Sequence, residues 1–384
     1  MSLGSPMGRQ VDLTLLQKLV QINWLLIVLI SLIAGVGFAM LYSAANGSID
    51  PWASRQMIRF GAGLGLMLLI AVVDVRAWLR HAYLIYGAAL LLLVAVEVMG
   101  VVGMGARRWV DLGLFQLQPS EVMKIAMVLA LARFYHSLPL EYVGRIRWLI
   151  VPAVLIMVPV ALVMRQPDLG TAILLMATGT AILLLAGVRL WKFAVAFGAV
   201  LLAIPLAWRF MLHGYQKDRV LTYLNPERDP LGAGYHIMQS KIALGSGGLF
   251  GKGFMQGTQS HLAFLPERQT DFIFTMLAEE FGLMGCLGLL SLYVLVITYG
   301  YAIAMRSRSQ FGRLLATGVI TTFFIYVFIN MAMVMGLIPV VGVPLPLVSY
   351  GGTSMMSLLI GFGLVLSVYV HRDVTMARRP GYGG

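Results

Sequence analysis

The stretch FIFTMLAEEFGLMGCLGLLSLYVLVITYGYAIAM, residues 272–305, decides the class of fold. It is longer than the roughly 20 apolar residues that a helix needs to cross a bilayer, so we expect a span that projects beyond the membrane. The whole chain agrees: 59% of its 384 residues are hydrophobic and 11% are charged, against about 25% charged in a typical soluble domain. Its apolar runs are continuous rather than alternating, which favours helices over a β-barrel.

Working outward from this stretch, the sequence predicts an all-α polytopic membrane protein of about ten spans. The expected spans are 22–42, 56–73, 83–102, 121–134, 148–164, 169–187, 193–212, 272–305, 314–338 and 353–370. The domain organisation is then a cytoplasmic segment 1–21, one transmembrane domain 22–371 with a long loop at 213–271, and a cytoplasmic tail 372–384.

Lysine and arginine mark every second connection between these spans, for example at 76–80, 145–147 and 306–313. By the positive-inside rule both termini are therefore expected in the cytoplasm and the loop 213–271 outside. The first apolar run is too long for the core of a cleavable signal peptide. We attribute the net charge of +12 to cytoplasmic loops near anionic headgroups, and we expect no nucleic-acid partner.

The loop 213–271 is polar in an otherwise apolar chain, and it ends in GSGGLFGKGFMQGTQSHLAFLPERQTDF, 245–272. Loops on a rigid scaffold often carry function. Its glycines can cradle a phosphate through backbone N–H groups, although they do not match a Walker A loop. Asp271 directly precedes a span, where an aspartate is often only a helix cap.

Several ionisable residues lie at the predicted ends of spans or within them, where charge is costly and functional by default. Glu121 and Lys124 are three apart and share a helix face. They predict either an interfacial ion pair or, as we favour, a cavity lining below Arg107 and Arg108. Asp168, in QPDLGT, 166–171, suits a helix cap at least as well as a functional role.

Glu279 and Glu280 lie two helical turns deeper than Asp271, and at least one must face a polar cavity or a basic partner, for which Lys241 is a candidate. The prolines and glycines of VPLPLVSYGGTS, 343–354, predict irregular backbone at membrane depth, which is tolerated only beside a protein-enclosed or wet cavity. The residues alone thus favour an outward-facing polar cavity, typical of an enzyme acting on a lipid-linked substrate or of a transporter.

Four motifs resemble the bacterial SEDS family (shape, elongation, division and sporulation), in the family's order and across nearly the whole chain. They are GARRWVDLGLFQLQPSEVMKI, 105–125; QPDLGT, 166–171; NPERDPLGAGYHIMQSKIALGSGGLFGKGFMQGTQSHLAFLPERQTDFIF, 225–274; and PLPLVSYGGTS, 344–354. The resemblance implies a peptidoglycan glycosyltransferase that polymerises lipid II outside the bacterial cytoplasmic membrane. It also implies a class B penicillin-binding protein and other elongation-complex membrane proteins as partners.

The resemblance places the family's essential aspartate at Asp271. Other important positions carry over to Arg107, Arg108, Glu121, Lys124, Asp168, Lys241, Glu279, Glu280 and Ser349. An inverting displacement needs a base on the acceptor hydroxyl and charge stabilisation of the pyrophosphate that leaves. Asp271 is the expected base, or else a ligand of a magnesium or manganese ion. Arg107, Arg108 and Lys241 are candidates for the pyrophosphate.

Two functions of other classes remain open at this point. A lipid II flippase suits charged cavities and broken helices equally well, but it needs polar lining reachable from both faces. A non-enzymatic scaffold for wall assembly would not need buried carboxylates. Small residues on the eighth and ninth spans, namely Gly285, Gly288, Ala302 and Gly318, predict where a partner's helix packs.

Overall fold

The computed structural model describes residues 14–103, 106–111, 113, 116–210, 214–225, 233–261 and 268–376. Within them, eight helices are long and apolar enough to cross a membrane: α2 (Trp24–Ala44), α3 (Trp52–Val72), α4 (Val75–Met99), α6 (Ile146–Arg165), α8 (Leu190–Phe210), α12 (Ile273–Arg306), α13 (Gln310–Val334) and α14 (Gly352–Val370). The apolar helix α7 (Leu169–Leu185) and the charge-bearing α5 (Pro119–Ser137) lie among them. The predicted helical, polytopic fold class is confirmed.

The central layer of the bundle is formed by α13 and α5, most of whose residues are buried. Helix α14 packs most extensively against α3, and α5 packs against α4 and α13. Helix α8 stands apart from the bundle, and none of its described residues is buried. Gly318, predicted to face a partner, instead lies inside: a Cβ atom there would sit 2.7 Å from Val128, so that prediction is wrong.

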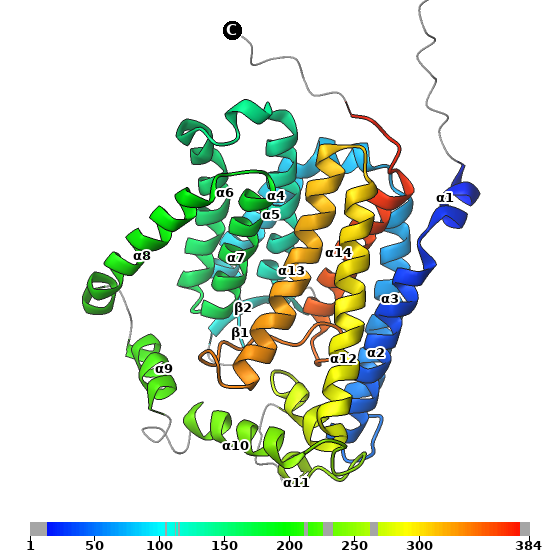
Figure 1. Cartoon of the computed structure of the whole chain (residues 1–384), viewed down its shortest axis with the longest axis vertical. Helices are drawn as coiled ribbons and strands as arrows, with labels where there is room; N and C mark the ends of the chain where they lie inside the picture. The colour runs from blue at the N-terminus through cyan, green and yellow to red at the C-terminus, as the bar shows by residue number, and fades with distance from the viewer. Residues whose placement is uncertain are drawn as a thin grey trace, which may run out of the picture.

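Figure 1 shows α1 (Leu15–Gln21) and the C-terminal end of α14 at one end of the bundle, with α9 (Gly214–Leu224), α10 (Ala233–Ser246) and α11 (Thr258–His261) at the other. The segment 213–271 is therefore partly helical rather than a plain loop. Helix α10 forms because Ile237, Ser240 and Ala243, spaced by three residues, give it one buried face. Which end is cytoplasmic stays a prediction from charge.

A small antiparallel sheet follows α4, in the order β1 (Val101–Gly103), β2 (Ala106–Asp111) and β3 (Gln116–Leu117). The third span was predicted to reach residue 102, but Gly100 ends the helix in an extended conformation, and the β-branched residues after it favour a strand. The fourth helix starts earlier than predicted, at Pro119, because proline suits the first helical position.

Helix α12 has 34 residues, as long as the sequence predicts, but it is kinked at Gly282, whose φ is 62°. The glycine-rich segment 247–253 packs directly on this kink. A Cβ at Gly247 would lie 2.0 Å from the carbonyl oxygen of Ala278, and one at Gly251 would lie 2.1 Å from that of Glu280. These glycines therefore allow two backbones to touch.

Candidate functional site

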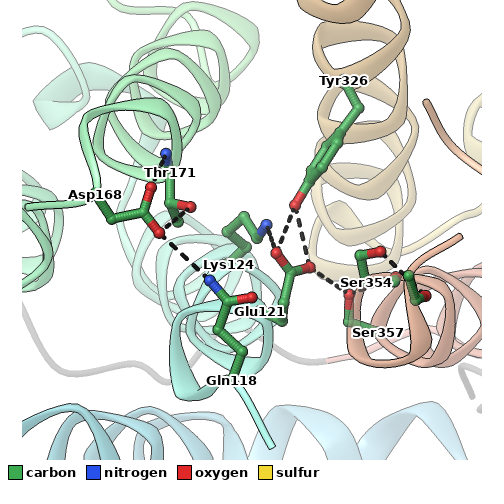
Figure 2. A network of polar contacts seen from close by, with 9 residues as sticks. Gln118, Glu121, Lys124, Asp168, Thr171, Tyr326, Ser354 and Ser357 are labelled. Carbon is green, nitrogen blue, oxygen red and sulfur yellow. Dashed lines mark hydrogen bonds and ion pairs between the residues drawn. The ribbon is translucent and has the colours of Figure 1, made fainter. Parts of the chain in front are cut away.

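The ion pair on α5 is the most enclosed of the ion pairs that the structure describes. Lys124 Nζ lies 2.6 Å from Glu121 Oε1, and the two side chains are 2% and 6% exposed. Tyr326 of α13 places its hydroxyl 3.1 Å from each oxygen of Glu121, and Ser357 of α14 donates to Oε2 at 3.0 Å. Figure 2 shows the four side chains converging from three helices.

The ion pair also borders a small cavity. The ammonium of Lys124 sits 4.3 Å from the centre of the Tyr326 ring, a favourable cation–π distance. The adjoining space, between α5, α13 and α14, amounts to about 20 Å³, which is room for about one water molecule. That volume is too small for a sugar ring.

Asp168 is the N-cap of α7, as the sequence allowed. Its carboxylate accepts hydrogen bonds from the Thr171 backbone N–H at 3.1 Å and from the Thr171 hydroxyl at 2.9 Å. Gln118, at the start of α5, donates to the same carboxylate at 3.3 Å and links it towards Glu121 (Figure 2). The carboxylate of Asp168 therefore caps α7 and joins it to the start of α5.

Arg107 and Arg108 both lie on β2. Arg108 donates to the carbonyl oxygens of Gln166, at 3.2 Å, and Pro167. Its guanidinium thus shapes the turn that leads to Asp168. The backbone of Arg107 pairs with Val102 in the sheet, and its side chain lies outside the described part.

Asp271 belongs to a turn, residues 268–272, whose backbone carbonyls are held one after another. The Gln269 oxygen accepts from the Tyr350 N–H at 2.8 Å. The Thr270 oxygen accepts from the Ser349 hydroxyl at 2.5 Å, and the Asp271 oxygen from the Asn330 amide at 2.9 Å. The irregular backbone predicted for 343–354 is confirmed over 343–351, which supports this turn, whereas residues 352–354 already belong to α14.

The carboxylate of Asp271 is half-buried and does not occupy the cap position of α12. That position belongs to Phe272, which makes no side-chain capping bond. A Cβ atom at Gly342 would lie 3.5 Å from Asp271 Oδ2, so a residue without a side chain flanks the carboxylate. The neighbouring Arg268 is partly buried, and burial holds the pKa of its guanidinium below the ordinary value.

Glu279 and Glu280 are buried, and their described partners come from the glycine-rich segment, from α11 and from α2. Glu279 pairs with Lys252 at 2.7 Å, not with Lys241, so that predicted pairing is wrong. Glu280 accepts from Ser43 at 2.5 Å and lies 3.3 Å from His261 Nε2. Both acids therefore fasten the segment that contains Lys252 and His261 to α12.

The phosphate-cradle interpretation of the glycine-rich segment does not hold for its central residues. The N–H groups of Lys252 and Gly253 donate, both at 3.0 Å, to the carbonyl oxygens of Glu279 and Glu280. The N–H of Gly251 donates within the segment, to Gly247, at 2.8 Å. Donors that are already satisfied by protein carbonyls cannot bind a phosphate.

Lys241 and Ser349 take different roles from each other. Lys241 on α10 is exposed, and its side chain runs past Gly336, just beyond α13. Ser349 is buried, and it receives the Leu345 N–H at 2.7 Å while donating to Thr270. Ser349 therefore folds the segment 343–351 and supports the turn.

Sequence reasoning missed three residues of this site: Tyr326, Asn330 and Ser357. Each is a polar residue in an apolar helix. Asn330 in IYVFINMAMV, 325–334, carried the clearest signal, because a lone amide in a membrane helix needs a partner.

Comparison with known proteins gives consistent matches along the chain. The family model for FtsW, RodA and SpoVE, described as cell cycle protein, matches residues 17–374. "Peptidoglycan glycosyltransferase MrdB" of Escherichia coli (strain K12) is 47% identical over 354 residues, which cover 91% of this chain and 94% of the relative. "Stage V sporulation protein E" of Bacillus subtilis (strain 168) is 37% identical, covering 90% and 96%.

Solved structures agree with these matches. The rod shape determining protein RodA of Thermus thermophilus is 32% identical, with a TM-score of 0.70, covering 92% of this chain and 98% of that one. A chain in the structure described as "Structural coordination of polymerization and crosslinking by a peptidoglycan synthase complex" is 36% identical. Its TM-score is 0.80, and the match covers 91% of this chain and 98% of that one.

Proposed function

The chain belongs to the FtsW, RodA and SpoVE family, and from this premise we propose that it polymerises lipid II at the outer face of a bacterial cytoplasmic membrane, with Asp271 as the base. It is a peptidoglycan glycosyltransferase of cell elongation, in keeping with its 47% identity to MrdB. The observation that carries the site is the turn 268–272. Its backbone is held by α13 and by the segment 343–351, while α12 begins without using Asp271 as its cap.

The reaction asks for one proton acceptor. In an inverting transfer, the acceptor hydroxyl gives its proton to a carboxylate as its oxygen attacks the anomeric carbon, and the lipid pyrophosphate leaves. Asp271 supplies that carboxylate, and the neighbouring Gly342 adds no side chain of its own beside Oδ2. The hydrogen bonds to the backbone carbonyls of residues 269–271 hold the main chain of Asp271 in place.

The pyrophosphate leaves as an anion, and positive charge nearby stabilises it. Arg108 already donates through Nε and one terminal nitrogen to two backbone carbonyls, and Lys124 is buried against Glu121. Lys241 is exposed and makes no described ion pair, so we assign it, among the described cations, to the leaving group. Its stem lies along Gly336 at the end of α13, on the side of the bundle where Asp271 lies.

A divalent cation fits this site only in company with substrate. The described residues hold no group of three or more His, Cys, Asp or Glu side chains that would cage an ion. Magnesium is commonly held by one or two carboxylates together with substrate phosphates. Asp271 and the pyrophosphate oxygens would hold such an ion, which would stabilise the charge of the leaving group.

We assign the partner's binding face to the exposed side of α12. A similar chain belongs to a peptidoglycan synthase complex that coordinates polymerisation and crosslinking. This supports a class B penicillin-binding protein beside this chain. Leu283, Met284 and Leu287 are 47%, 51% and 45% exposed, and a Cβ at Gly288 would meet no atom within 4 Å. A partner's transmembrane helix can approach closely there.

The test is the isosteric change Asp271→Asn in the purified chain with its partner, assayed by lipid II polymerisation. Loss of a general base typically lowers the rate about 10²–10⁴-fold, and we expect a folded but inactive protein. Asp74→Asn is the matched control, because Asp74 caps α4 by accepting the Arg76 N–H and asparagine caps a helix about as well as aspartate, so it should keep most activity. Near-wild-type synthesis by Asp271→Asn would remove Asp271 from the chemistry.

A further inference from the structure

Asn330 is a buried amide on α13 that the proposed chemistry does not use directly. Its side chain is fully buried. Its amide nitrogen donates to the carbonyl oxygens of Asp271 at 2.9 Å and of Val343 at 2.7 Å. The opposite orientation of the amide would set its oxygen against both carbonyls, so the two acceptors determine which way it points. Asn330 therefore ties together two segments that are distant in sequence.

These two segments are the turn that carries Asp271 and the irregular segment that follows α13. The other two bonds of the turn, at Gln269 and Thr270, come from residues 349 and 350 of the irregular segment. Asn330 alone joins the turn directly to a regular helix through the described bonds of these three carbonyls. It also donates to the backbone of Asp271, the residue whose carboxylate is the proposed base.

The same face of α13 reaches the buried ion pair. Tyr326 precedes Asn330 by four residues, so the two side chains share a face and lie about 6 Å apart along the axis. Tyr326 contacts both carboxylate oxygens of Glu121. One helix thus fixes the turn of Asp271 relative to α5 and its ion pair.

We propose that Asn330 is a positioning residue for glycosyl transfer: it holds the main chain of Asp271 against α13 and Val343, so that the carboxylate meets the acceptor hydroxyl. The inference rests on the proposed role of Asp271. It predicts an effect on the chemical step rather than on substrate binding, because Asn330 is buried behind the turn and touches no open space.

The experiment is steady-state lipid II polymerisation by the full chain with its partner, using Asn330→Leu. Leucine is similar in size and lacks both donors. A misplacement of about 1 Å can cost about 10²-fold in rate, so we expect kcat to fall about 10–100-fold while KM stays within about twofold. Thr317→Val is the matched control. It removes a buried bond on the same helix, from the Thr317 hydroxyl to the Arg313 carbonyl at 2.7 Å, and should leave kcat unchanged.

A second arm separates this inference from the proposed function. In an Asp271→Asn background, measured over long incubations, Asn330→Leu should cause no further loss, since the residue acts through Asp271. Two results would overturn the inference: a full further loss of activity in the Asp271→Asn background, or a wild-type kcat per folded molecule for Asn330→Leu alone. If Asp271→Asn is inactive in the same assay, Asp271 remains the proposed base. Activity in Asp271→Asn alone overturns the base instead.

If Asn330→Leu fails to fold, Asn330→Ser replaces it. Serine keeps one donor, so we expect a kcat between those of the wild type and Asp271→Asn with an unchanged KM. A wild-type kcat for that variant would equally overturn the inference.

Discussion

The buried ion pair of Glu121 and Lys124 gives a quantitative prediction through Glu121→Gln, Lys124→Met and their combination. Removing one partner of a buried pair costs about 3–5 kcal/mol, whereas replacing both is often close to neutral. In Lys124→Met the carboxylate keeps the hydroxyls of Tyr326 and Ser357, so we expect the low end, about 3 kcal/mol. In Glu121→Gln the ammonium keeps the Tyr326 ring but loses its carboxylate, so we expect about 5 kcal/mol.

The assay is reversible unfolding of the purified chain in mixed micelles, compared as a double-mutant cycle. We expect the double variant to be more stable than either single variant, because no uncompensated charge remains. Tyr326→Phe is the calibration: it keeps the ring over Lys124 and removes one hydrogen bond to a charged group, worth about 1.5–3 kcal/mol. Single effects that add to within about 0.5 kcal/mol in the double variant would refute a bonded, buried pair.

Three further predictions test the packing, the pH dependence and the orientation. Gly251→Ala should lower the melting temperature, because its φ is 81° and its Cβ would collide with a backbone oxygen, whereas Gly288→Ala, with open space around it, should not; equal melting temperatures would contradict the contact with α12. Burial holds the pKa of His371 below its ordinary value, although the Ser367 carbonyl and Asp74 oppose this shift, so the neutral ring stabilises the fold above about pH 6.5 and that stability should fall as the pH drops through the folded pKa. Melting at pH 7.5 and 5.5 should show this slope in the wild type and a flatter one in His371→Gln. In a cysteine-free background, an impermeant thiol reagent on intact cells should label Gln256→Cys and not Arg308→Cys, and the reverse would overturn the predicted orientation.

The sequence by itself determined the features that depend on residues close along the chain. Apolar length predicts a span wherever it occurs, because each helix satisfies its own backbone hydrogen bonds in lipid. The spacing of Glu121 and Lys124 puts them on one helix face, and they do form an ion pair. Asp168 caps α7 because a cap needs only the next three residues.

Only the tertiary structure decided which distant groups meet. Lys252 lies within the glycine-rich segment 247–253 and Lys241 precedes that segment on α10; the kink at Gly282 places Lys252, not Lys241, against Glu279. The glycines that suggested a phosphate site are needed because two backbones touch.

The turn that carries Asp271 shows most clearly that contacts between distant residues depend on the tertiary structure. Asn330 reaches it across 59 residues of sequence, and Ser349 across 79 from Thr270. Local periodicity identifies a face of a helix but not the element that covers it, since that choice is made by the packing of the whole bundle. The sequence therefore pointed to Asp271 as the proposed base, while the packing decided what holds its backbone in place.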